Sequence, residues 1–200
     1  MTNFEKKFRI EDALRTGTDL ETFKKVIFEL IPEFKTLDIP HEQPAHRYDI
    51  ITHTYYVVQG VSDNRYVKLA ALFHDIGKPS TKFLGDDGVY HYWGHPHRSY
   101  LMTRMIMSNL NYYEDTINIV SAMVKYHDTY INQSDDFFDM CINEMHVENL
   151  DLFCELQHAD LFAHAESYAN RHIAQLEEAH LDYKERAKVY LYCWPVLMVR

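Results

Sequence analysis

Residues 69–82 read LAALFHDIGKPSTK, and this stretch decides what kind of fold the chain can form. It opens with five apolar residues, as in a helix buried on all sides, and Gly77 and Pro79 end that helix. Between them stand an imidazole and a carboxylate, His74 and Asp75. A buried histidine and a buried aspartate lose their hydration, so each must be paired or bound to a cation. We therefore expect a buried helix that ends near Gly77 and carries a polar site.

The segments on both sides of this stretch have the spacing of amphipathic helices, with apolar residues every three or four positions. In residues 18–34, Pro32 ends a helix whose apolar stripe is Leu20, Phe23, Ile27 and Leu30. The same spacing predicts further helices at 49–60, 63–77, 95–110, 114–127, 147–172 and 177–193. Residues 82–93 contain Gly-Asp-Asp-Gly, which predicts a short hairpin or loop. The sequence thus predicts an all-α helical bundle with one short excursion.

Composition favours a single domain without a disulfide framework. Of the 200 residues, 46% are hydrophobic, which is enough for a substantial core. We expect a metal-site core at 46–165, an N-terminal helical extension at 1–45 and C-terminal helices at 166–200. The number of cysteines is odd and no two have C-x-x-C spacing, so we expect reduced thiols at Cys141, Cys154 and Cys193.

The distribution of charge argues against a broad nucleic-acid interface. The net charge is −10, whereas binding to a phosphate backbone needs clustered cations. From Arg65 to Arg104, however, the sequence contains six basic and three acidic residues, a local excess of +3 around the polar site. No segment has the length of a signal peptide's apolar core or of a membrane span. We therefore expect a soluble cytoplasmic protein with no membrane association.

Four residues on three predicted helices have the chemistry of a metal site. His53 and His74 offer imidazole nitrogens, while Asp75 and Asp160 offer carboxylate oxygens. Two nitrogen and two oxygen ligands suit zinc, manganese, iron, cobalt or nickel, and magnesium is less suited to histidine. A cation bound between these four side chains would replace the hydration that each loses on burial.

Five segments in this order resemble the HD-domain phosphohydrolases, and most of all the HD segment of bacterial CCA-adding enzymes and poly(A) polymerases. They are THTYYVVQ (52–59), KLAALFHDIGKPST (68–81), YHYWGHPHRS (90–99), VKYHD (124–128) and LQHADLFA (156–163). The resemblance covers about residues 20 to 165 and implies the HD helical bundle. Only some twenty residues precede it, so we expect no nucleotidyltransferase head and no polymerisation.

The resemblance also implies roles for individual residues. It maps the metal ligands onto His53, His74, Asp75 and Asp160, although Asp151, His158 and His164 stay open as alternatives to Asp160. Asp75 would also orient the attacking water. Lys78 would contact the substrate phosphate or that water, unless it only stabilises a helix C-terminus. His95 and His127 would hold a second metal ion or the phosphate. Arg98 is a further candidate for the phosphate because guanidinium binds two oxygens at once.

These roles imply a metal-dependent phosphohydrolase with one or two divalent ions. Its expected partner is a small phosphorylated molecule, such as a nucleotide, cleaved as a phosphomonoester or a 2′,3′-cyclic phosphodiester by a metal-activated water. The alternative is a regulatory HD module that binds a nucleotide with slow or absent turnover. Action on tRNA 3′ ends is a third possibility, and the acidic charge fits it poorly. The sequence leaves the oligomeric state open.

Overall fold

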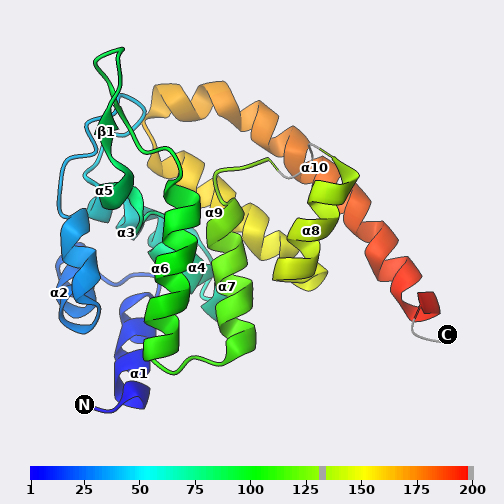
Figure 1. Ribbon diagram of the computed structural model, residues 1–200, viewed down its shortest axis with the longest axis horizontal. Coiled ribbons are helices and arrows are strands. Elements are labelled where there is room, and N and C mark those ends of the chain that lie inside the picture. The colour runs from blue at the N-terminus through cyan, green and yellow to red at the C-terminus, as the bar shows by residue number, and fades with distance from the viewer. Residues whose placement is uncertain (131–133, 198–200) are drawn as a thin grey trace.

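Helix α4 (Arg65–Phe73) is the innermost helix, as its apolar sequence predicts. Every residue from Val67 to Phe73 is buried. Helices α3 (Ile50–Gly60), α7 (Glu114–Tyr126) and α9 (Leu150–Ala163) pack against it (Figure 1). The structure, a computed structural model, describes residues 1–130 and 134–197, with side chains as far as position 190 except 189.

The predicted all-α class is confirmed, because the described part of the chain is 71% helical and has ten α-helices and one two-stranded sheet. The remaining α-helices are α1 (Asn3–Ala13), α2 (Leu20–Leu30), α5 (Lys78–Thr81), α6 (His95–Asn109), α8 (Asp135–Met145) and α10 (Glu166–Leu197). Two short 3-10 helices are η1 (Pro32–Leu37) and η2 (Val147–Asn149), and the strands are β1 (Phe83–Leu84) and β2 (Tyr90–His91).

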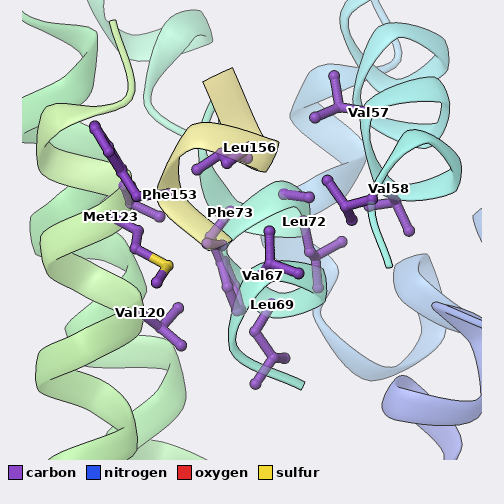
Figure 2. Packing of buried hydrophobic residues seen from close by; sticks show 14 of the residues in the cluster. Val57, Val58, Val67, Leu69, Leu72, Phe73, Val120, Met123, Phe153 and Leu156 are labelled. Atoms are coloured by element: carbon purple, nitrogen blue, oxygen red, sulfur yellow. The ribbon is translucent and has the colours of Figure 1, made fainter. Parts of the chain in front are cut away.

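One continuous cluster of buried apolar side chains runs through the bundle. Its centre is drawn in Figure 2, where Phe73 of α4 lies near Met123 of α7 and Phe153 of α9. All three of these side chains are at most 1% exposed. Burial of this kind contributes about 1.5–3 kcal/mol for each large apolar side chain, so this layer fixes how the surrounding helices are placed.

Three helix boundaries differ from those predicted. The central helix ends at Phe73 instead of Gly77, because residues 74–77 form a turn that leads into α5. The helix predicted over 147–172 is interrupted at residues 164–165, where the Ala165 amide donates to the Ala45 carbonyl at 2.8 Å. The C-terminal segment is one helix, α10, as far as Leu197. Helix α8 was not predicted, although Ser134 caps it by accepting from the Phe137 amide.

The predicted hairpin is present as β1 and β2. Phe83 pairs with His91, and Leu84 pairs with Tyr90, in antiparallel register. The turn between them includes Gly88, whose φ of +73° is a conformation that glycine adopts without strain. The hairpin projects from the top of the bundle in Figure 1, beside the start of α10.

The side chains of two of the three cysteines are described, and both are buried free thiols. Burial raises the pKa of Cys141 and of Cys154 to about 12, so both remain protonated at neutral pH. The Cys193 side chain lies outside the described residues. Within the helices that the structure describes, none combines the length and the apolar character needed to cross a membrane.

Candidate metal centre

Two of the predicted ligands come from helices that are distant in the sequence and packed together in the fold, α3 and α9. His53 shares the buried face of α3 with Ile50 and Val57, which lie three residues before it and four residues after it. Asp160 on α9 faces the same point, and its Oδ1 lies 2.8 Å from His53 Nε2. The structure therefore brings together two residues that are 107 positions apart.

His74 and Asp75 stand in the turn between α4 and α5, which lies very close to α6. A Cβ atom on Gly77 would be 2.6 Å from the Ser99 backbone nitrogen, so glycine is needed there. The Gly77 amide also donates to Ser99 Oγ at 2.9 Å. This turn sets Asp75 Oδ2 3.2 Å from His74 Nε2 and 3.6 Å from His53 Nε2.

The other oxygen of Asp75 faces two more histidines, His95 and His127. Gly94 has a φ of +81°, which lets the chain turn from the hairpin into α6 and places His95 in the first turn of that helix. His127 directly follows α7. Asp75 Oδ1 lies 3.2 Å from His95 Nε2 and 3.8 Å from His127 Nε2. Asp75 thus stands between two groups of imidazoles.

Three of these imidazoles are oriented in the same way. Each Nδ1 bonds to the backbone carbonyl three residues earlier, at 2.8 Å for His74, 3.0 Å for His95 and 2.8 Å for His127. A carbonyl can only accept, so Nδ1 must donate its hydrogen, and Nε2 is left as the nitrogen that can bind an ion. Histidines that bind metals are commonly held by their second nitrogen in this way.

The Nε2 atoms form two close pairs. His53 and His74 are 3.4 Å apart at these atoms, and His95 and His127 are 3.3 Å apart. Two unprotonated imidazole nitrogens repel each other, so each pair needs a proton or a cation between its members. Asp75 is fully buried, and neither of its oxygens has a hydrogen-bond partner among the described residues. These orphaned oxygens and converging nitrogens fit a divalent cation.

Two groups of residues around Asp75 could therefore each hold an ion. Within each group, the ligand atoms all lie within 4.8 Å of one another. The first group consists of His53, His74 and Asp160, with Asp75 Oδ2 alongside, and the second consists of Asp75, His95 and His127. We call these residues together the Asp75 cluster.

Both carboxylates of the cluster are ionised at neutral pH. Burial alone would raise the pKa of Asp75, but the charges of His74 and Lys78 outweigh it and hold that pKa well below its usual range. The same balance, with His164 as the largest opposing charge, holds the pKa of Asp160 well below its usual range. Ionised carboxylates are the form that binds cations.

Lys78 is buried beside the cluster. Its Nζ lies 2.8 Å from Asp75 Oδ2, outside hydrogen-bonding angles, and donates to His41 Nε2 at 3.0 Å. Burial, and then the nearby Lys78, lower the pKa of His41 to about 2. The His41 imidazole is therefore neutral and able to accept from the ammonium group, which is held against Asp75.

A cavity of about 450 Å³ opens onto the cluster, a size typical of sites for small ligands. Lys78, His95, His127 and Asp160 lie on its wall, so both groups of the Asp75 cluster contribute to it. Trp93 and Tyr168 also line it, from the hairpin side and from α10.

The structure places Arg98, the predicted phosphate-binding arginine, away from this cavity. Its side chain is exposed, and Nε donates at 3.3 Å to Oγ of Ser80 in α5. Arg98 is not among the described residues that line the cavity. Arg98 lies in the first turn of α6, three residues after His95, and its side chain faces outward. The periodicity of the sequence alone did not distinguish this outward face from the face that carries His95.

The three alternatives to Asp160 lie at different distances from the cluster. Asp151 is exposed and pairs with Lys184 at 3.2 Å. His158 is about 200° around α9 from Asp160 and lines a separate hollow of about 590 Å³. His164 is near, with Nδ1 bonded to the Asp160 carbonyl at 2.7 Å and 3.8 Å from its Oδ1.

Asp128 and His46 are among the residues near the site that were not nominated from the sequence. Asp128 lines the cavity, and its signal was its place directly after His127, which repeats the His-Asp doublet at 74–75. His46 offers a ligand atom within 4.8 Å of those of His53 and His164. It lies in a loop without periodicity, so no pattern in the sequence pointed to it.

Comparison with known proteins adds no assignment, since no family model matches the chain and no curated protein does either. The resemblance of its motifs to HD-domain phosphohydrolases therefore stays a prediction, and the site is interpreted from its own geometry.

Proposed function

We propose that this protein is a metal-dependent phosphohydrolase that acts on a nucleotide or another small phosphoester. The observation that carries the proposal is the position of Asp75, whose two buried oxygens have no hydrogen-bond partner among the described residues and face two groups of Nε2 atoms next to an open cavity. His53, His74, Asp75 and Asp160 would hold one ion, and Asp75, His95 and His127 would hold a second. Nitrogen and carboxylate ligands of this kind suit zinc, manganese, iron, cobalt or nickel.

The charges around the cavity support a role for cations. The ionised carboxylates of Asp75 and Asp160 outnumber the Lys78 ammonium, so a phosphate group would be repelled unless bound cations reversed the sign of the potential. Divalent ions at such a site polarise phosphoryl oxygens and lower the pKa of a bound water, which is the chemistry that hydrolysis needs.

The chain's own residues would bind and orient the phosphate. The Lys78 ammonium lies on the cavity wall and would neutralise charge on the phosphoryl oxygens as the transition state forms. The hydrogen bonds from Nδ1 of His74, His95 and His127 to backbone carbonyls hold the three rings in place before a substrate arrives. Such preorganisation lowers the cost of reaching the transition state.

Elemental analysis together with a turnover assay tests the proposal. The purified protein should contain one or two equivalents of a divalent transition metal and should release phosphate or open the ring in a panel of nucleotide monophosphates and 2′,3′-cyclic nucleotides. Removal of the metal by a chelator should abolish turnover, and added metal should restore it. Nucleotide binding without any product in the metal-loaded protein would reject the hydrolase and favour a regulatory module.

A further inference from the structure

The most exposed large aromatic side chain at the cavity is Trp93, at 73% exposed. Tryptophan is enriched at interfaces because its ring is apolar while its N–H can form a hydrogen bond. Trp93 lies two residues before His95, so its backbone is within about 7 Å of that of a proposed metal ligand. Trp93 therefore lines the same cavity as His95.

Two neighbouring rings of the hairpin contact this indole. The Trp93 ring lies 4.9 Å from the Phe83 ring and 5.0 Å from the His91 ring, centre to centre. His91 is itself held by Asp87, at 3.0 Å, and by close contact with Gly85, where a Cβ atom would be 2.7 Å from the imidazole. A ring held in this way loses little conformational entropy when a ligand stacks on it.

A second aromatic wall belongs to the same cavity. Tyr168 lines it from α10 and stacks on His164, with ring centres 4.9 Å apart and planes inclined by 20°. The cavity thus combines a wall of charged and metal-binding groups with two aromatic walls. A ligand that fits it carries a phosphate and a flat aromatic group in one molecule.

We infer that Trp93 is the residue on which a nucleobase stacks, so that the cavity selects nucleotides over sugar phosphates. The inference rests on the proposed function for the position of the phosphate at the Asp75 cluster. Every nucleobase has an aromatic face, whereas a sugar phosphate has none, so stacking on indole discriminates between them. Trp93 is a specificity-determining residue in this assignment.

Fluorescence titration of the metal-loaded protein tests the inference directly. The probes are adenosine 5′-, 3′- and 2′-monophosphate, and ribose 5-phosphate is the matched probe without a base. At least one adenosine phosphate should quench indole emission saturably, and ribose 5-phosphate should not. In Trp93→Phe the saturable quenching should disappear, because Trp93 is the one tryptophan among the described residues that line the cavity. Absence of quenching by all three nucleotides would overturn the inference.

Calorimetry on variants measures how much Trp93 contributes to the preference for a nucleotide over ribose 5-phosphate. Trp93→Leu should weaken binding of the adenosine phosphate about 5- to 150-fold relative to ribose 5-phosphate, the effect expected for loss of one stacking contact. Trp93→Phe keeps a ring and should lose less of the preference. Tyr113→Leu is the control, since Tyr113 is 79% exposed and stands before α7, outside the cavity lining, and its preference should equal that of the wild type.

The results separate this inference from the proposed function. Nucleotide preference that depends on Trp93, without any turnover, would reject the hydrolase and support the stacking subsite. Turnover of nucleotides with the same preference in the wild type and in Trp93→Leu would support the hydrolase and overturn the stacking subsite.

Discussion

Two groups of histidines in this protein differ in what surrounds them: those of the Asp75 cluster are buried, whereas His158 and His180 are half-buried. In the Asp75 cluster, the Nε2 atoms of facing rings are 3.3–3.4 Å apart, and an oxygen of Asp75 lies 3.2–3.8 Å from each of them. On the far face of α9, His158 and His180 have ring centres 6.1 Å apart, and His180 Nε2 bonds to the amide oxygen of Gln157 at 3.1 Å. The second pair belongs to none of the possible metal-binding groups found among the described residues.

The comparison shows that a lowered histidine pKa does not identify a metal site. Burial lowers the pKa of His127 to about 3 and that of His180 to about 4, so both rings are neutral at pH 7. What distinguishes the Asp75 cluster is the orientation of its imidazole rings, whose Nε2 atoms point toward Asp75. The His158 and His180 pair therefore supplies matched controls for the cluster.

The largest effect is expected from Asp75→Asn, which keeps the shape of the side chain and removes its charge. Both groups lose the ligand that they share, so metal content should fall below roughly half an equivalent. Turnover should fall by more than the roughly 10- to 100-fold that is typical when a residue hydrogen-bonded to a metal ligand is replaced. Asp151→Asn, on the far face of α9, should leave both values unchanged. Metal analysis and phosphate release measure the two variants, and retention of metal by Asp75→Asn would break the comparison.

A second effect concerns stability and depends on whether metal is bound. Lys78→Met removes the buried partner of Asp75, which should cost about 3–5 kcal/mol of unfolding free energy in the metal-free protein. Bound cations would neutralise Asp75 instead, so the loss should be smaller in the metal-loaded protein. Urea unfolding with and without chelator measures this difference.

Lys68→Met is the control for that experiment. Lys68 is also buried, but its Nζ donates to the Val58 carbonyl at 2.7 Å, away from the cluster. Its loss of stability should be the same with and without metal. Equal metal dependence for the two lysine variants would contradict the placement of Lys78 against a cation site.

A third effect should separate the two halves of the cluster. His127→Ala removes a ligand on the Oδ1 side of Asp75 only, so a protein with two equivalents of metal should retain about one, and turnover should fall at least about 10-fold. His158→Ala should retain both equivalents. Loss of all metal from His127→Ala would show that the two halves bind as one unit.

The smallest effect is a pH dependence at His180 in the metal-free protein. Its pKa is lowered in the fold, by burial first and then by His158 and Lys184, so the unfolded chain binds the proton more readily. Stability should therefore fall as the pH drops from about 6.5 towards 4. His180→Gln keeps a donor for Gln157 without titrating, so its loss of stability between pH 7 and pH 5 should be smaller. Equal losses in urea unfolding would show that this ring is not buried in solution.

Local patterns predicted most helices, and they failed where a distant contact decides the outcome. The spacing of Leu20, Phe23 and Ile27 was enough for α2 because a helix shows its buried face in its own sequence. The interruption between α9 and α10 has no glycine or proline to mark it. It coincides with a hydrogen bond from the Ala165 amide to the Ala45 carbonyl, 120 positions away.

The sequence by itself determined which chemical groups are available and on which helices they lie, including the His74-Asp75 doublet directly after a run of apolar residues. Only the tertiary structure decided where those groups point. It turned Lys78 toward Asp75, left Arg98 on the outside and set Trp93 at the mouth of the cavity. The physical reason is that periodicity gives the face of one helix, whereas convergence of side chains depends on how several helices pack around a common core.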